Sequence, residues 1–493
     1  MSAMTTRNTK WLDGLRGIAA AIVAFDRLFM GDLDFPFRSF WADPPTKNRF
    51  WIQLPPFRII FGARAMVTLF FVVSGYAISI NLVRARHRRP QAFLSEVASS
   101  TTRRLFRLYL PVLMVVCLSQ FLFFIGLYHS TTFVHNEYVG QSHAKHSSNK
   151  LQPWSAPWAH LQYLVRYMVD IVNPFVVFEY KNTRHLDLNE QLWTMPIEFR
   201  GSCLVYFLVV AMAPWRAQRR SLALAALSLY FLWYGMWDIA TFIAGLWLAE
   251  LKVAEEGEQQ HYLQTDDDSD EEIGNSLLQQ PSSNLSPLPS LPSSSSSSSS
   301  SSAWSGNLNA DGKKTRSIVS PLSIINLLVF ALGIHLLCLG DEGILTRGYR
   351  GLLLIQPSSW DKRDVVHFSW KSVGAVMTVY AISSSPRRLL QRPLESSRVI
   401  QYMGRISFSL YLVQQIVYNL WRDPVKNWIW KDLAGYAYPG GHLADREPFA
   451  RAVMWIGSIM ILGPVLVFLA DAFMRYVDVP CMALARKVER WLT

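Results

Sequence analysis

The chain has 493 residues, of which 51% are hydrophobic and 17% are charged, and its formal net charge is +12. The apolar residues come in blocks of roughly 18 to 22, the length that crosses a bilayer, which argues against a string of soluble domains. The basic residues lie at the ends of these blocks, where they set membrane topology, and this placement argues against a nucleic-acid partner.

Ten apolar blocks predict an all-α polytopic membrane protein with about ten transmembrane helices. The N-terminal half of the membrane domain, residues 1–251, contains six of them, near 12–30, 61–83, 108–127, 193–213, 221–235 and 237–251. The C-terminal half, residues 320–493, contains four, near 320–339, 366–383, 402–420 and 452–472.

The segment 252–319 differs from the rest of the chain in composition. It begins with acidic residues, continues with proline and serine, and contains an unbroken serine run at 293–302. Such a composition cannot bury a core, so we expect a disordered cytosolic loop between the two halves.

Arginine clusters predict the orientation of the helices. Residues 84–107 contain seven arginines and one acidic residue, which places this segment in the cytosol by the positive-inside rule. Counting spans from there places the basic clusters near 216–220, 387–392 and 486–490 on the same side, and both termini in the cytosol. We expect a multi-pass protein of the endoplasmic reticulum or another internal membrane, with the plasma membrane as the alternative.

The first span carries four charged residues, Asp13, Arg16, Asp26 and Arg27. Arg16 and Arg27 are eleven residues apart, so they share one helix face and lie about 16 Å apart along the axis. Charges inside membrane helices are costly and are usually functional, although internal ion pairs that only fix helix packing are the alternative. No histidine or cysteine spacing predicts a metal site.

Six short motifs in this order resemble those of the membrane-bound acyltransferase 3 family. They are residues 12–20 (LDGLRGIAA), 70–75 (FFVVSG), 103–111 (RRLFRLYLP), 192–199 (LWTMPIEF), 242–245 (FIAG) and 404–412 (GRISFSLYL). The resemblance covers nearly the whole chain and is greatest to the fungal branch, which is often found in secondary-metabolite pathways.

The resemblance implies a membrane-bound O-acyltransferase that moves an acyl group, acetyl above all, from acyl-CoA to a hydroxyl of a small molecule. Acyl-CoA would be a co-substrate, with no permanently bound cofactor. CoA carries phosphates, which arginines bind through charge-assisted hydrogen bonds. Arg16, Arg104 and Arg107 lie on the predicted cytosolic side and are the expected CoA-binding residues; topology control is the alternative role of Arg104 and Arg107.

The sequence departs from the family at one position. Arg27 stands where the family has a histidine, its presumed base, and arginine stays protonated. The candidate catalytic residues are therefore Asp26, Arg27 and Glu198, with Asp26 or Glu198 as the base or as ion-pair partner of Arg27. His185 is a less favoured base.

Two rival functions stay open. The first is a catalytically silent relative that transports or senses a small molecule, since intramembrane charges suit a substrate pathway equally well. The second, a transferase that modifies polysaccharides on the outer face, is disfavoured by the small lumenal loops.

Overall fold

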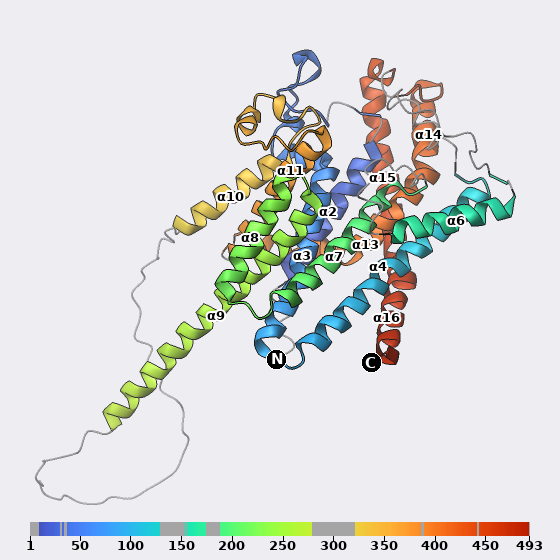
Figure 1. Ribbon diagram of the computed structural model, residues 1–493. Helices are drawn as coiled ribbons and strands as arrows, with labels where there is room; N and C mark the ends of the chain where they lie inside the picture. The colour runs from blue at the N-terminus through green and yellow to red at the C-terminus, as the bar shows by residue number, and fades with distance from the viewer. Residues whose placement is uncertain are drawn as a thin grey trace, which may run out of the picture. The chain divides into compact units, whose positions relative to one another are not determined.

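A computed structural model describes the chain over residues 9–29, 32–33, 37–128, 153–154, 156–173, 188–278, 321–385, 389–440 and 443–492. Within these ranges the chain forms helices and turns and contains no β-strand, which confirms the predicted all-α class (Figure 1). The chain divides into two compact units, one of residues 1–253 with 325–493 and the other of residues 254–324.

Most of the α-helices lie in the first unit. They are α2 (Lys10–Phe29), α3 (Ala63–Arg88), α4 (Phe93–Phe124), α6 (Pro157–Val172), α7 (Thr194–Ala211), α8 (Ala217–Trp233), α9 (Trp237–Leu278), α10 (Pro321–Leu337), α11 (Arg363–Ser384), α12 (Gln391–Ser396), α13 (Arg398–Val417), α14 (Asp423–Ala434), α15 (Pro448–Phe473) and α16 (Val479–Leu492). α9 and α10 extend into the second unit. Short π-helical turns join α13 to α14, at Tyr418–Arg422, and α15 to α16, at Met474–Asp478.

Every one of the ten predicted spans falls on a helix, but not all of the described helices are long and apolar enough to cross a bilayer. Five stretches are long and apolar enough, namely Ala63–Arg88, Phe93–Phe124, Glu190–Ala211, Arg363–Ser384 and Pro448–Trp491. α2 is less apolar because five of its 20 residues are charged, and α8 and α10 have 17 residues each. The protein is an integral membrane protein; ten crossings and cytosolic termini stay predictions.

Two helices continue beyond the apolar blocks that predicted them. α4 begins at Phe93 rather than near 108, because the serines, threonines and arginines before the block are compatible with a helix. α9 runs on to Leu278, so residues 252–278 of the segment predicted to be a disordered loop are helical. Glutamate and glutamine, frequent in this stretch, favour helix. The remaining residues of that segment, 279–319, lie outside the described ranges.

The packing places α3 at the centre of the first unit. In the apolar 18-residue part of α3, 78% of the residues are buried, against 28% in the corresponding part of Pro448–Trp491. α3 contacts α2, α7 and α11, while α2 has its largest contact with α13. α4 contacts α7 and lies beside α16 (Figure 1).

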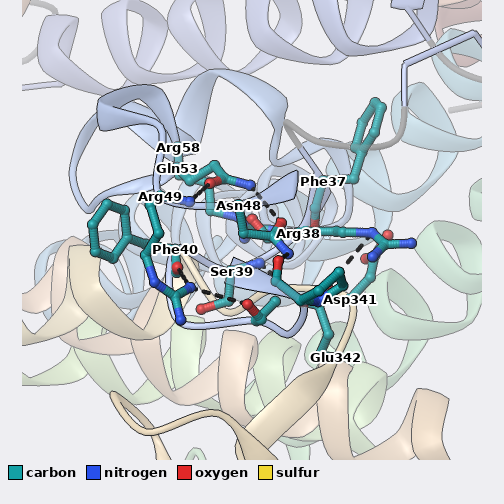
Figure 2. A network of polar contacts seen from close by, with 12 residues as sticks. Phe37, Arg38, Ser39, Phe40, Asn48, Arg49, Gln53, Arg58, Asp341 and Glu342 are labelled. Carbon is teal, nitrogen blue, oxygen red and sulfur yellow. Dashed lines mark hydrogen bonds and ion pairs between the residues drawn. The ribbon is translucent and has the colours of Figure 1, made fainter. Parts of the chain in front are cut away.

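Two loop segments, residues 37–61 and 338–345, are joined by polar contacts, and we call them the cap. Arg58 is buried and donates to the carbonyl oxygens of Arg38 (3.0 Å), Cys338 (2.7 Å) and Phe37. The Ser39 backbone N–H donates to Glu342 Oε2 at 2.9 Å. Figure 2 shows these side chains converging between the two segments.

Candidate active site

The first and last family-like motifs meet where α2 crosses α13. A Cβ atom added to Gly17 would lie 2.4 Å from the Gly404 nitrogen, and one added to Gly404 would lie 2.2 Å from the Asp13 carbonyl oxygen. Only glycine lets two backbones approach so closely. The crossing therefore fixes α2, and with it Arg16, against α13.

A second close crossing joins α3 to α9. A Cβ on Gly75 would lie 2.5 Å from the Phe242 carbonyl oxygen, and one on Gly245 would lie 2.4 Å from that of Val72. The motifs at 70–75 and 242–245 are thus complementary packing surfaces. This contact holds the segment of α3 that carries Ser74.

Arg104, Glu198, Ser74 and Ser202, from α3, α4 and α7, form what we call the Arg104–Glu198 centre. Arg104 Nη2 lies 2.9 Å from Glu198 Oε1, and Arg104 Nε donates to Ser202 Oγ at 2.7 Å. Ser74 Oγ donates to the same Glu198 oxygen at 2.9 Å. The Arg104 and Glu198 side chains are 24% and 19% exposed, so the pair is only partly shielded from solvent. Residues predicted separately to bind CoA and to act in catalysis are direct partners.

Arg16, Arg107 and Asp478 surround this centre. Arg16 interacts electrostatically with Arg104, Arg107 and Glu198. Asp478 ends the π turn before α16, is buried, and interacts with Arg16 and Arg107. Asp13 also interacts with Arg16, so the three arginines lie among three carboxylates. Arg107 is exposed, and its guanidinium is the group at this end of α2 that can bind an anionic ligand.

Tyr411 of α13 extends the polar contacts away from the centre. Its hydroxyl lies 2.7 Å from Thr194 Oγ1 and also donates to the Gln191 carbonyl oxygen. Tyr411 interacts electrostatically with Glu198 on one side and with Arg27 and Glu190 on the other. It therefore lies between the two groups of charged residues.

Arg27 forms an ion pair with Glu190, with Arg27 Nη1 2.8 Å from Glu190 Oε2. This partner differs from Asp26 and Glu198, the two carboxylates considered from the sequence. Glu190 precedes α7 and its side chain is 67% exposed, against 13% for Arg27. Asp26 is buried and accepts one long hydrogen bond, 3.4 Å, from the Ala63 backbone N–H.

The six predicted site residues therefore fall into two groups. Arg16, Arg104, Arg107 and Glu198 lie together, whereas Asp26 and Arg27 lie about 15 Å farther along α2. Ser74 and Tyr411 belong to motifs quoted from the sequence, but nothing in one chain shows that they contact Glu198 and Thr194. Glu190 had no such signal. His185 lies outside the described residues.

The part of the chain that the structure describes contains no group of three or more histidine, cysteine, aspartate or glutamate side chains able to hold a metal ion.

Comparison with known proteins agrees with the motifs. An acyltransferase domain of the acyltransferase 3 type matches residues 9–475. The chain is 23% identical to O-acetyltransferase PaAT-1 of Phomopsis amygdali, over 98% of this chain and 84% of that protein. It is 22% identical to acyltransferase clz18 of Cochliobolus lunatus, over 86% of this chain and 85% of that protein. No solved structure matches. This chain belongs to the membrane-bound acyltransferase 3 family.

Proposed function

We propose that this membrane acyltransferase transfers an acyl group, acetyl above all, from acyl-CoA to a hydroxyl of a small molecule, such as a fungal secondary metabolite. The observation that carries the proposal is the Arg104–Glu198 centre, where a carboxylate lies beside several arginines. The name of the Phomopsis relative supports acetyl as the group transferred. An internal membrane, with the endoplasmic reticulum first, is the proposed location.

The arginines would hold the donor. Arg16 and Arg107 lie beside the centre, and Arg107 is exposed at its edge. Guanidinium groups bind phosphate in a bidentate manner, so Arg107 suits a CoA phosphate. Arg104 is already bonded to Glu198 and Ser202, so we assign it to orienting the carboxylate as well as to adding positive charge.

The reaction also needs a base. The base takes the proton of the acceptor hydroxyl, the hydroxyl oxygen attacks the thioester carbon, the C–S bond breaks, and the CoA thiolate receives the proton. Two carboxylates qualify. Glu198 accepts two hydrogen bonds through Oε1, and among the described residues Oε2 has no hydrogen-bond partner. Asp26 is more deeply buried and accepts one long bond.

The test uses membranes that contain the full-length protein, supplied with acetyl-CoA and an extract of the producing cells. Wild type should release CoA, and Glu198→Gln and Arg107→Ala should each lower the rate at least tenfold. Arg219→Ala is the matched control, because Arg219 is an exposed arginine of α8 in another basic cluster. Wild-type rates in both site variants would refute the assignment.

A second candidate function is a catalytically silent relative that transports or senses a small molecule. The observation that favours it is Arg27, which occupies the family's histidine position and is paired with Glu190. Arg27→His distinguishes the two candidates. A large gain in acyl transfer over a silent wild type would favour the second function, whereas an active wild type that gains little would favour the first.

A further inference from the structure

A second group of buried polar side chains lies outside the Arg104–Glu198 centre, and we call it the α11 cluster. It consists of His367 and Lys371 of α11 with Asp26 of α2, each at most 4% exposed. His367 and Lys371 are four residues apart and share one helix face. Asp26 and Lys371 interact electrostatically, as do Lys371 and His367.

The polar atoms of this cluster are largely without partners. Within the part of the chain that the structure describes, neither ring nitrogen of His367 has a hydrogen-bond partner. Among the described residues, the ammonium of Lys371 has neither a hydrogen bond nor an ion pair, and only its backbone carbonyl is engaged, by Thr68. Each buried polar group left unpaired destabilises a fold by about 1–3 kcal/mol, and a buried charge costs more. Two unpaired nitrogens on the buried ring of His367, beside the ammonium of Lys371, indicate that a ligand completes them.

The cap covers the cluster. Gly343, in the second cap segment, has a φ of 75°, and a Cβ there would lie 3.2 Å from His367 Nε2. Arg58 of the first cap segment is the charged side chain that acts most strongly on Lys371. The cap segments are also joined by the Arg38–Glu342 contact at 4.0 Å, and Asp341 of the cap lies 3.9 Å from Arg64. Long, exposed pairs of this kind contribute little stability, so the bonds of the buried Arg58 are the main polar link between the two cap segments.

We propose that the α11 cluster binds the acceptor hydroxyl, with Lys371 and His367 as substrate-binding residues that donate to its oxygen and Asp26 as the base that takes its proton. A hydroxyl accepts two hydrogen bonds and donates one, so it can form one hydrogen bond with each of the three side chains. His367 is assigned as a donor because Asp26, the carboxylate of the α11 cluster, is the group that can take the proton. The proton passes from the acceptor to Asp26, and the CoA thiolate formed by C–S cleavage takes it up.

The inference rests on the proposed acyltransferase function and adds to it a separate binding site for each of the two substrates. Acyl-CoA would be held at the Arg104–Glu198 centre, and the acceptor would enter from the cap side. The two ends of α2 are about 15 Å apart. Acyl-CoA would bind at one end and the acceptor at the other, and the pantetheine arm of CoA would span the distance between them. Lys371 and His367 are in none of the family-like motifs.

The experiment uses purified full-length protein in nanodiscs, acetyl-CoA, and three probe acceptors: benzyl alcohol, cyclohexanol and phenol. We expect Lys371→Met and His367→Leu each to raise the KM of the alcohol that wild type acetylates by about tenfold or more, the value of one strong hydrogen bond. The KM of acetyl-CoA should stay within about twofold. His367→Gln, which keeps a donor, should lie closer to wild type than His367→Leu. Lys362→Met is the matched control, because Lys362 is exposed and lies immediately before α11.

Thermal stability separates binding from folding. Lys371→Met removes an unpaired buried charge and should leave the melting temperature unchanged or raised. Unchanged alcohol KM values in both variants would overturn the inference and leave the proposed function standing, since water alone would then complete the cluster. A parallel rise in the KM of acetyl-CoA would also overturn it. A wild type that releases no CoA with any alcohol or with cell extract would refute the proposed function itself.

Discussion

Gly404→Ala tests the close crossing of α2 and α13. The new Cβ would lie 2.2 Å from the Asp13 carbonyl oxygen, whereas ordinary contacts begin at 3.4 Å, so the helices must separate by about 1 Å. The partner atom is backbone and cannot rotate away. Overpacking of this kind costs about 1–3 kcal/mol, and the better helix propensity of alanine returns about 1 kcal/mol. We expect a net loss of up to about 2 kcal/mol in stability.

The assay heats detergent-solubilised protein and follows the fraction that stays monodisperse in size-exclusion chromatography. Gly257→Ala in α9 is the matched control, because no atom of the described residues lies within 4 Å of its added Cβ, and alanine favours the helix by about 1 kcal/mol. Gly17→Ala should destabilise like Gly404→Ala, and the double variant should lose less than the sum, because one helix separation relieves both clashes. A Gly404→Ala protein as stable as Gly257→Ala would refute the close crossing.

Three further substitutions have defined outcomes. Tyr411→Phe removes the hydroxyl between the two charged groups, so CoA release should fall about tenfold, at a stability cost of about 1 kcal/mol; a wild-type rate would contradict this. Glu250→Gln leaves the guanidiniums of Arg86 and Arg220, 2.7 and 2.9 Å away, without their counter-charge, and should cost about 3–5 kcal/mol, seen as loss of the monodisperse peak; an unchanged peak would be the contrary result. Arg58→Lys keeps the charge but cannot reach three carbonyls, so limited proteolysis should cleave the cap faster, and equal cleavage rates would count against the cap contacts.

The helices were predictable where hydrophobicity alone decides them. The blocks near 61–83 and 366–383 coincide closely with α3 and α11, because a membrane helix must satisfy its backbone within itself. The ends of helices were less predictable. α4 and α9 extend through polar sequence, where hydropathy gives no signal and only the helix propensity of the residues does.

The candidate site was predictable as a set of residue types but not as a set of contacts. Arg104 and Glu198 are 94 positions apart, and one sequence does not show that two charges so far apart are partners. The same limit applies to Arg27, whose partner Glu190 belongs to no motif. Lys371 and His367 lie inside an apolar block, but the sequence alone does not show that their side chains are buried. The packing of α11 against α3 shows it.

The carbonyl contacts of Arg58 have a consequence for the order in which the protein is assembled. One of its acceptors, Cys338, follows it by 280 positions, so this bond cannot form until most of the chain has been synthesised. Before then a buried guanidinium at this position would have its two local acceptors but would lack the third, which favours leaving it in water. The first cap segment would therefore stay open during membrane insertion and close only after the C-terminal half has been inserted. A closed cap would then indicate that the helix bundle is complete.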